Sequence, residues 1–120
     1  MSAATFDFTD SFRIEQGVYR EQRFVWRNNA GSIIPLVGFT ARMQLRKSKP
    51  STEVLLELST QNGKIVINGD QGEIVIIFSE TDTVGVSWRA GVYDLEITSS
   101  DNKTTRFIEG AFEVSPEVTR

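Results

Sequence analysis

The 120-residue chain contains no cysteine and no histidine. Without cysteine it has no disulfide, no thiolate metal ligand and no thiol nucleophile, which also fits assembly in a reducing cytoplasm. Without histidine it lacks the commonest general base near neutral pH and the commonest metal ligand. A Ser-His-Asp or Cys-His catalytic arrangement is therefore excluded, and we expect no enzyme, no bound metal and no cofactor.

The chain also lacks a strong positive charge and a long apolar run. Its formal net charge is −3, whereas a nucleic-acid partner would require a concentrated basic face. Residues 1–7 have neither the basic region nor the apolar region of a secretion signal, and no apolar run approaches the ~20 residues that span a bilayer. We expect a single soluble domain without nucleic-acid or membrane partners.

A hydrophobic period of two dominates the sequence. Residues 41–46 and 92–98 alternate apolar and polar side chains, whereas residues 73–78 form an almost continuous β-branched run. Alternation is typical of strands with one buried face, and the continuous run of a more deeply buried strand. The pattern predicts strands near 11–15, 18–27, 39–47, 53–59, 64–67, 73–78, 91–98 and 103–114.

The connections are short and rich in turn residues. Asn, Gly and Asp cluster at 28–31, 61–63, 68–72 and 100–102, where they favour tight turns. Ser79 precedes two acidic residues, which predicts one short helical turn near 79–84. About eight short strands indicate an all-β fold, a two-sheet antiparallel β-sandwich, with a small closed barrel as the alternative.

Residues 90–95 contain a tyrosine motif. Gly91 lies two residues before Tyr93, and Leu95 lies two residues after it. This spacing resembles the penultimate strand of immunoglobulin-like domains, with Leu95 in place of the core cysteine. The resemblance implies that the Tyr93 hydroxyl bonds to the backbone at a corner between the sheets; the alternative is an ordinary core aromatic. With Trp26 as the large residue between the sheets, the expected core is Trp26, Gly91, Tyr93 and Leu95.

A polar stripe lies on the strand near 39–47, where Arg42, Gln44 and Arg46 share one face. Pairing with acidic residues such as Glu57 or Glu96 on neighbouring strands is one interpretation. A charged docking surface is the other, and the sequence leaves both open.

Carboxylates are the only acid–base groups available. Asp94 and Glu96 are two residues apart, a spacing that a glycosidase-type mechanism could use, and Asp70, Asp101 and Asn102 offer oxygen atoms in turns. We expect these side chains to be solvated strand and turn residues, so no catalytic or metal-binding residue is predicted.

The N-terminal residues 1–10 form either an arm or the first strand, ahead of a single sandwich domain at 11–120. Phe6 and Phe8 alternate with polar residues in this segment. One hypothesis is that the segment adds to an exposed sheet edge of a neighbouring subunit. The other is that it forms a strand of its own sandwich. The possible interface residues are therefore Phe6, Phe8, Arg42, Gln44 and Arg46.

The order and spacing of four stretches, 23–31, 35–46, 55–63 and 91–96, resemble small bacteriophage and prophage virion-associated proteins and the N-terminal β-sandwich of phage baseplate upper proteins. The resemblance covers roughly residues 15–115. It implies a non-enzymatic adaptor or peripheral subunit of the tail, baseplate or tail-fibre attachment region, with other virion proteins as partners. A head decoration or neck protein is the alternative, and a carbohydrate-binding module is a more remote one.

The same resemblance implies a location in the virion after assembly in the bacterial cytoplasm. A repeated subunit of this kind is expected to form a homo-oligomer with the symmetry of the particle.

Overall fold

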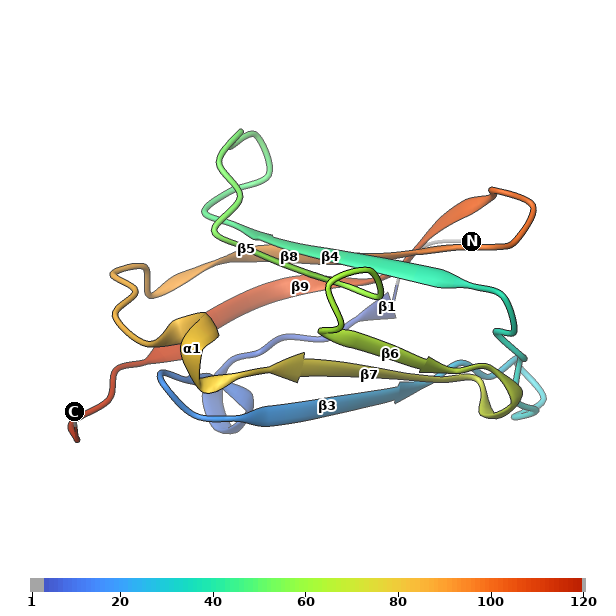
Figure 1. Ribbon diagram of the computed structural model, residues 1–120, viewed down its shortest axis with the longest axis horizontal. Helices are drawn as coiled ribbons and strands as arrows, with labels where there is room; N and C mark the ends of the chain where they lie inside the picture. Colours follow the sequence, from blue (N-terminus) through green and yellow to red (C-terminus); the bar gives the residue numbers. More distant parts are fainter. Residues whose placement is uncertain (1–3, 120) are drawn as a thin grey trace.

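The computed structural model describes residues 4–119 as two stacked β-sheets (Figure 1). The large sheet has the strand order β1-β9-β8-β4-β5, with β2 also paired to β9, and the small sheet has the order β3-β7-β6. The predicted β-sandwich is confirmed. The strands are β1 (Ala4–Thr5), β2 (Ile14–Glu15), β3 (Arg20–Val25), β4 (Thr40–Arg46), β5 (Leu56–Ser59), β6 (Ile65–Asn68), β7 (Glu73–Phe78), β8 (Ala90–Thr98) and β9 (Thr104–Ser115).

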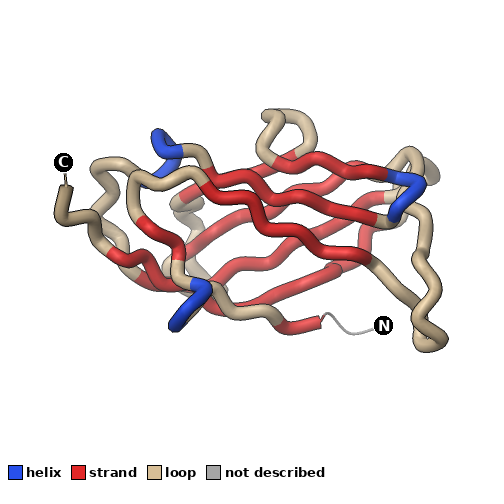
Figure 2. The backbone as a smooth tube through the Cα atoms, turned by 90° about the horizontal axis from the view of Figure 1, so that it is seen from below, coloured by secondary structure: helices blue, strands red, loops and turns tan. Residues whose placement is uncertain are grey.

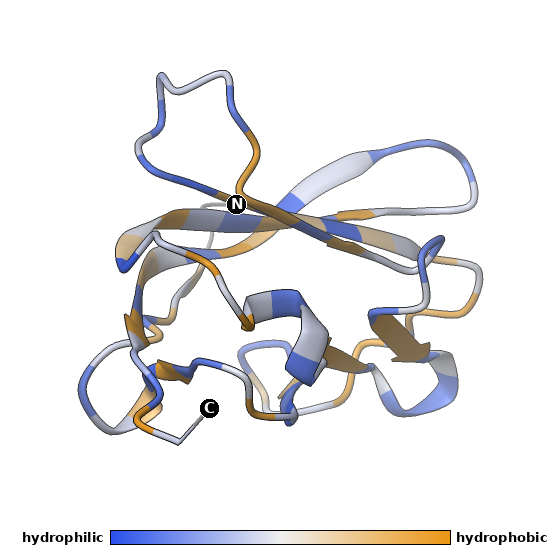
Figure 3. Ribbon diagram, turned by 60° about the vertical axis from the view of Figure 1, so that its left-hand side comes forward, coloured by the Kyte–Doolittle hydropathy of each residue, from blue (hydrophilic) through white to orange (hydrophobic). Residues whose placement is uncertain are grey.

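The alternation in the sequence places the apolar side chains between the sheets. In β4, Ala41, Met43 and Leu45 are buried, while the residues between them face outward. Figure 3 shows hydrophobic positions alternating with hydrophilic ones along the strands, and hydrophilic colours dominating the loops. The strands at 39–47, 64–67, 73–78 and 91–98 are confirmed to within about a residue because burial of one face fixes their register.

The predicted helical turn is confirmed as α1 (Glu80–Thr83). Ser79 and Asp82 form a capping box at its start, in which each side chain accepts a hydrogen bond from the backbone of the other residue. The Lys64 ammonium lies 2.7 Å from the Asp82 carboxylate, whose side chain is only 7% exposed. Burial by itself would raise the pKa of Asp82, but hydrogen bonds from Lys64 and Ser79 outweigh it and lower that pKa.

The N-terminal segment belongs to the sandwich of its own chain. β1 and β2 pair in parallel with β9, so the predicted antiparallel arrangement applies to the central strands but not to these two. Phe8 is fully buried opposite Phe112, and Phe6 donates its backbone N–H to the Glu109 carbonyl at 3.1 Å. The hypothesis that Phe6 and Phe8 add to a neighbouring subunit is therefore wrong for this structure, and the first-strand alternative holds.

Two short 3₁₀ turns complete the secondary structure, η1 (Asp10–Phe12) and η2 (Gly69–Gln71). The strand predicted near 11–15 is wrong over its first half because η1 occupies it. Asp10 adopts a φ of 51°, in the left-handed region, which interrupts pairing with β9 between β1 and β2.

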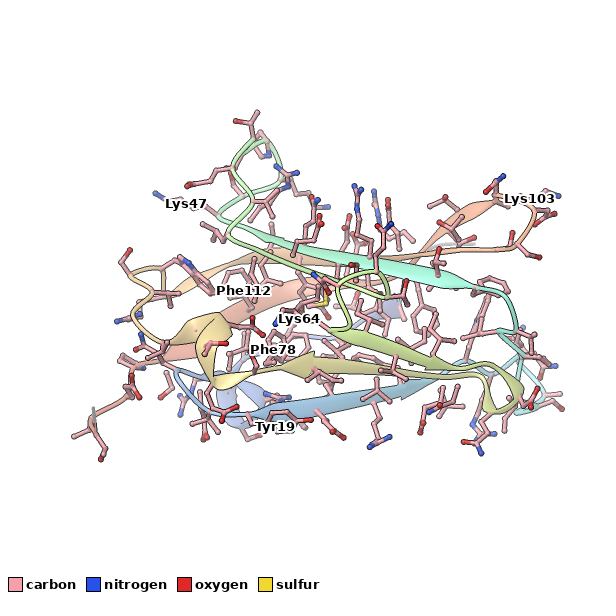
Figure 4. All side chains as sticks on the ribbon, in the orientation of Figure 1. Tyr19, Lys47, Lys64, Phe78, Lys103 and Phe112 are labelled. Atoms are coloured by element: carbon pink, nitrogen blue, oxygen red, sulfur yellow. The ribbon has the colours of Figure 1, made fainter. Side chains whose placement is uncertain are left out.

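Large aromatic and aliphatic side chains fill the space between the sheets. Phe78 comes from the small sheet and Phe112 from the large sheet, and Figure 4 shows both between the two layers. Leu95 is 1% exposed, which confirms its predicted place in the core. Trp26 is a correction: it is only partly buried and packs edge-on against Phe107 at a centroid distance of 5.7 Å. Its backbone follows the end of β3, so the ring covers the margin of the core.

Gly91 is part of the core for a steric reason. A Cβ atom at Gly91 would collide with the Arg46 carbonyl and lie 2.7 Å from the Phe112 ring. Gly110 on β9 is equally constrained, since a Cβ there would collide with the Phe6 carbonyl. These two positions let the aromatic ring and the N-terminal segment approach the large sheet closely.

Tyr93 is 5% exposed, and its hydroxyl donates a hydrogen bond of 2.5 Å to the Phe6 carbonyl. The hydroxyl does return to the backbone, as the resemblance implied. Its acceptor, however, lies 87 residues away in the N-terminal segment rather than at a corner near β8. Burial, followed by the nearby charge of Asp7, raises the pKa of Tyr93, so the hydroxyl stays protonated as a donor.

Candidate functional site

The outer side of the large sheet carries a continuous set of charged and polar side chains, which we call the charged face. Its members come from four adjacent strands, β5, β4, β8 and β9, and alternate with the core residues on the same strands. They are Arg42, Gln44, Arg46, Glu57, Asp94, Glu96, Arg106 and Glu109.

Strand register lines up opposite partners across this face. Gln44 of β4 lies between Glu57 of β5 and Asp94 of β8. Arg46 donates to the Gln44 side-chain carbonyl at 2.7 Å, and Gln44 in turn donates to the Glu57 carboxylate at 2.6 Å. The Gln44 amide therefore links the Arg46 guanidinium to the Glu57 carboxylate, and the two hydrogen bonds hold the three side chains in place.

A loop formed by residues 47–55 connects β4 to β5 next to this network, and Figure 1 shows it projecting away from the large sheet. Arg46 donates to the Ser51 carbonyl at 2.7 Å, which ties the loop to the end of β4. Lys49, in the loop, lies 3.7 Å from Glu109 of β9. Because β8 lies between β4 and β9, this side-chain contact reaches past β8 and links the loop to β9.

A β-bulge in β9 creates the far side of the charged face. Leu95 pairs with Ile108 while Glu96 pairs with Arg106, so Phe107 is an extra residue without a partner on β8. The bulge places Arg106 and Glu109 on the same face although they are three residues apart. Arg106 contacts Asp94 at 3.3 Å and Glu109 at 3.6 Å.

The sequence missed Lys49, Arg106 and Glu109 as members of the site. A strict period of two would place Arg106 and Glu109 on opposite faces, and only the bulge brings them together. One signal was available: the run Arg106–Phe107–Ile108–Glu109 has two adjacent apolar residues, which break the alternation where the bulge occurs. Lys49 lies in a loop whose position no periodicity predicts.

Two shallow hollows lie on the charged face. One has a volume of about 290 Å³ and is lined by residues of β4, β8 and β9 and by Lys49. The other is lined mostly by hydroxyl and amide side chains of β4, β5, the turn after β5, β8 and the start of β9. Arg42 and Glu96 line both hollows and therefore mark the centre of the surface. The Arg42 side chain is 62% exposed and its nearest carboxylate oxygen, on Glu57, is 3.9 Å away. It is available to a partner.

The first interpretation of the predicted polar stripe, pairing with acidic neighbours, is met in part, and the docking surface stays a prediction. Arg42, Gln44 and Arg46 do share one face, and Gln44 pairs with Glu57 as the first interpretation expects. Glu96 lies opposite Arg42 in the register, but within residues 4–119 no ion pair of 4.0 Å or less includes Glu96. Phe6 and Phe8, the other interface candidates, lie away from this face in the N-terminal segment.

The carboxylates that the sequence offered as acid–base groups or metal ligands are engaged in ion pairs where the structure shows their partners. Asp94 bonds to Arg106, and Asp101 in the hairpin after β8 lies 3.8 Å from Lys103. Over residues 4–119, no three His, Cys, Asp or Glu side chains are grouped so that they could hold a metal ion. In the same residues, no helix has the length and apolarity needed to cross a membrane.

Comparison with known proteins gives no independent assignment. No protein-family model matches the chain, and no curated protein matches its sequence.

Proposed function

We propose that this chain is a non-enzymatic assembly subunit of a bacteriophage particle that docks on a neighbouring virion protein through its charged face. The observation that carries the proposal is the network of polar contacts over β5, β4, β8 and β9, in which Gln44 and Arg46 hold charged side chains in place next to the projecting loop. Pre-ordered side chains lose little conformational entropy on binding. Alternating charge favours a partner with the complementary pattern.

The shape of the charged face favours a protein partner over a small molecule. Small-molecule sites are enclosed and mainly apolar, whereas the Arg42, Arg106 and Asp94 side chains here are 62%, 50% and 41% exposed. Such side chains suit the polar part of a protein–protein interface, where they set orientation and association rate.

A carbohydrate partner is the second class that we considered for a β-sandwich. Exposed aromatic side chains usually provide the stacking platform for a sugar ring. Within residues 4–119 the half-exposed aromatic residues are Phe12 and Tyr19, which lie outside the charged face, while Tyr93 beneath it is 5% exposed. The arrangement therefore supports the protein partner, and loss of glycan binding on changing Tyr19 would favour the sugar.

The bacteriophage part of the proposal is supported by the resemblance over residues 15–115. That resemblance includes the strands that build the charged face, because its stretches 35–46, 55–63 and 91–96 cover β4, β5 and much of β8. We place the subunit in the tail, baseplate or tail-fibre attachment region. A head decoration or neck position is the alternative.

The proposal is tested with particles of the phage or prophage that encodes the chain. Density-purified particles are expected to contain the protein at a fixed copy number, measured by quantitative mass spectrometry, and immunogold labelling is expected to mark the tail. Labelling of the head would favour the alternative position. Complete absence from purified particles would overturn the proposal.

A charge-reversed variant tests the docking surface itself. Arg42→Glu with Arg106→Glu changes two exposed side chains and is expected to fold normally but to be missing from particles. The matched control is Lys103→Glu with Arg27→Glu, which makes the same charge change at exposed positions outside the charged face. Incorporation of both double variants at the normal level would contradict docking through this face.

A further inference from the structure

β3 is a free edge of the small sheet, the lowest strand in Figure 1. Among residues 4–119 it pairs with β7 alone, and Figure 2 looks onto this three-stranded sheet from below. Trp26, which continues the register beyond β3, donates its N–H to the Gly72 carbonyl at 2.9 Å. Even-numbered residues of β3 therefore direct their backbone groups toward β7, and the odd-numbered Glu21, Arg23 and Val25 direct theirs outward.

The side chains of these odd-numbered residues form an ordered row on the outer face of the small sheet. Tyr19 precedes β3 and donates its hydroxyl to Glu21 at 2.6 Å, and Arg23 contacts Glu21 at 2.7 Å and Glu73 at 3.4 Å. The row begins and ends with a half-exposed apolar or aromatic residue, since Tyr19 is 50% and Val25 is 40% exposed. Its order is aromatic, acidic, basic, aliphatic.

When a second copy of this row runs in the opposite direction, each side chain lies opposite one of complementary charge or polarity. If a second copy approaches antiparallel, Glu21 of each copy lies opposite Arg23 of the other, and Tyr19 lies opposite Val25. Outward-facing backbone groups can bond only to outward-facing ones, so odd residues must pair with odd residues. A shift of one step in either direction would place Glu21 opposite Glu21 or Arg23 opposite Arg23, and like charges directly opposite are destabilising.

We propose that two copies of this chain join through the free edges of β3, antiparallel, with the two-fold axis beside Gln22. The small sheets then become one continuous sheet of twice the width across the dimer. An isologous contact of this kind requires self-complementarity about a two-fold axis, and the row from Tyr19 to Val25 provides it. The inference is independent of the proposed function because β3 lies in the opposite sheet from the charged face.

Charges on an edge strand also have a simpler role, because they prevent unwanted strand addition. That role alone requires no particular order of signs. The order of charges found here disfavours the two β3–β3 registers that are shifted by one step and favours the register in which Glu21 lies opposite Arg23. It therefore protects the edge against other strands and also selects a second copy of β3. A single strand pair buries less than the ~800 Å² per partner of a standard interface, so we expect a weak dimer that a repeated position in an assembly would strengthen.

The test uses the full chain in sedimentation equilibrium from about 10 μM to about 1 mM, a range suited to weak association. The native chain is expected to dimerise within this range. Glu21→Arg and Arg23→Glu are each expected to weaken self-association by at least about tenfold because each places two like-charged pairs in the interface. The double variant E21R/R23E restores opposite pairs and is expected to dimerise again.

Mixing the two single variants provides the sharpest measurement. A copy with Glu21→Arg and a copy with Arg23→Glu are complementary to each other, so the mixture is expected to form a heterodimer at concentrations where each variant alone is mostly monomeric. Circular dichroism confirms that each variant is folded. The control is R42E/R106E on the charged face, which is expected to leave the dimer unchanged.

Two outcomes would overturn the dimer. One is a native chain that stays monomeric over the whole concentration range, in which case the charges only protect the edge. The other is dimerisation that neither single variant alters, which would place the contact elsewhere. Both outcomes are distinguishable from failure of the proposed function, which is read from incorporation into particles.

Discussion

The outer faces of the two sheets offer different groups to a partner. On the large sheet, β4 and β8 are paired on both sides, so their backbone hydrogen bonds are satisfied and only side chains such as Arg42 and Glu96 are available. On the small sheet, β3 is unpaired on one side within the described residues, and Val25 on β3 and Val66 on β6 remain about 40% exposed. The first face can select by charge pattern alone, and the second adds the directional hydrogen bonds of a strand edge.

The largest expected effect comes from a side chain on which both faces depend. Phe8→Ala should lower the free energy of unfolding by about 3–5 kcal/mol, because it removes a fully buried ring that contacts the Phe78 and Tyr93 rings of opposite sheets. Urea unfolding followed by tryptophan fluorescence measures the change. Phe12→Ala, at a half-exposed ring, is the control and should have a much smaller effect. A loss at Phe8→Ala as small as the one expected for Phe12→Ala would contradict the place of Phe8 in the core.

The next effect concerns the tie between the large sheet and the N-terminal segment. Tyr93→Phe should cost about 1–3 kcal/mol, because the Phe6 carbonyl loses its hydrogen bond from a buried donor. Denaturant unfolding at neutral pH measures this loss. Tyr19→Phe removes a similar hydroxyl from the exposed row of the small sheet and should leave stability nearly unchanged. A Tyr93→Phe variant as stable as the native chain would mean that water replaces the bond.

A smaller effect on stability, which depends on pH, distinguishes the largely buried Lys64–Asp82 ion pair from the exposed ion pairs of the charged face. The lowered pKa of Asp82 means that its contribution to stability is present above its unfolded pKa, near 3.8, and is lost as the pH falls through the folded value. Asp82→Asn should therefore cost about 1 kcal/mol at neutral pH, a value discounted for partial solvent access.

Thermal unfolding of the native chain and of Asp82→Asn from neutral pH to below pH ~3.8 measures the dependence. The unfolding temperatures of the native chain and of Asp82→Asn should differ at neutral pH and converge at acid pH. A difference that stays constant over the whole range would assign the effect to the shape of the side chain rather than to its charge.

The smallest expected effect is on the stability of the charged face. Arg106→Ala should change the free energy of unfolding by no more than about 0.5 kcal/mol, because its contacts with Asp94 and Glu109 are about half exposed. Differential scanning calorimetry measures this directly. A loss several times larger would mean that the network supports the fold, and charge reversal there would then be a poor test of docking.

Much of the fold was predictable because burial enforces alternation locally. The strands β4 and β8 were placed correctly since each has a clear apolar face, and β7 was placed correctly because its apolar run is continuous. The helix α1 was placed correctly because Ser79 and Asp82 cap it. The 3₁₀ turn at Asp10–Phe12 was missed because Phe12, which the pattern counted as a strand residue, is half exposed.

The candidate site was predictable only in part. Arg42, Gln44 and Arg46 alternate on one strand, so their common face follows from the period of two. Their neighbours Arg106 and Glu109 depend on the bulge at Phe107, and Lys49 depends on a loop anchored by Arg46. Trp26 was assigned to the centre of the core because of its size, yet the end of β3 places it at the margin.

The sequence by itself determined an all-β chain with two half-buried sheets and no histidine or cysteine chemistry, because residue identity and the period of two are local properties. Tertiary structure alone decided which strands are neighbours, that the Tyr93 hydroxyl meets a carbonyl 87 residues away, and that no other strand of residues 4–119 covers the outer edge of β3. These are long-range features, fixed by the packing of both sheets around one shared core. The alternation of residues within one strand does not say which distant strand will lie beside it.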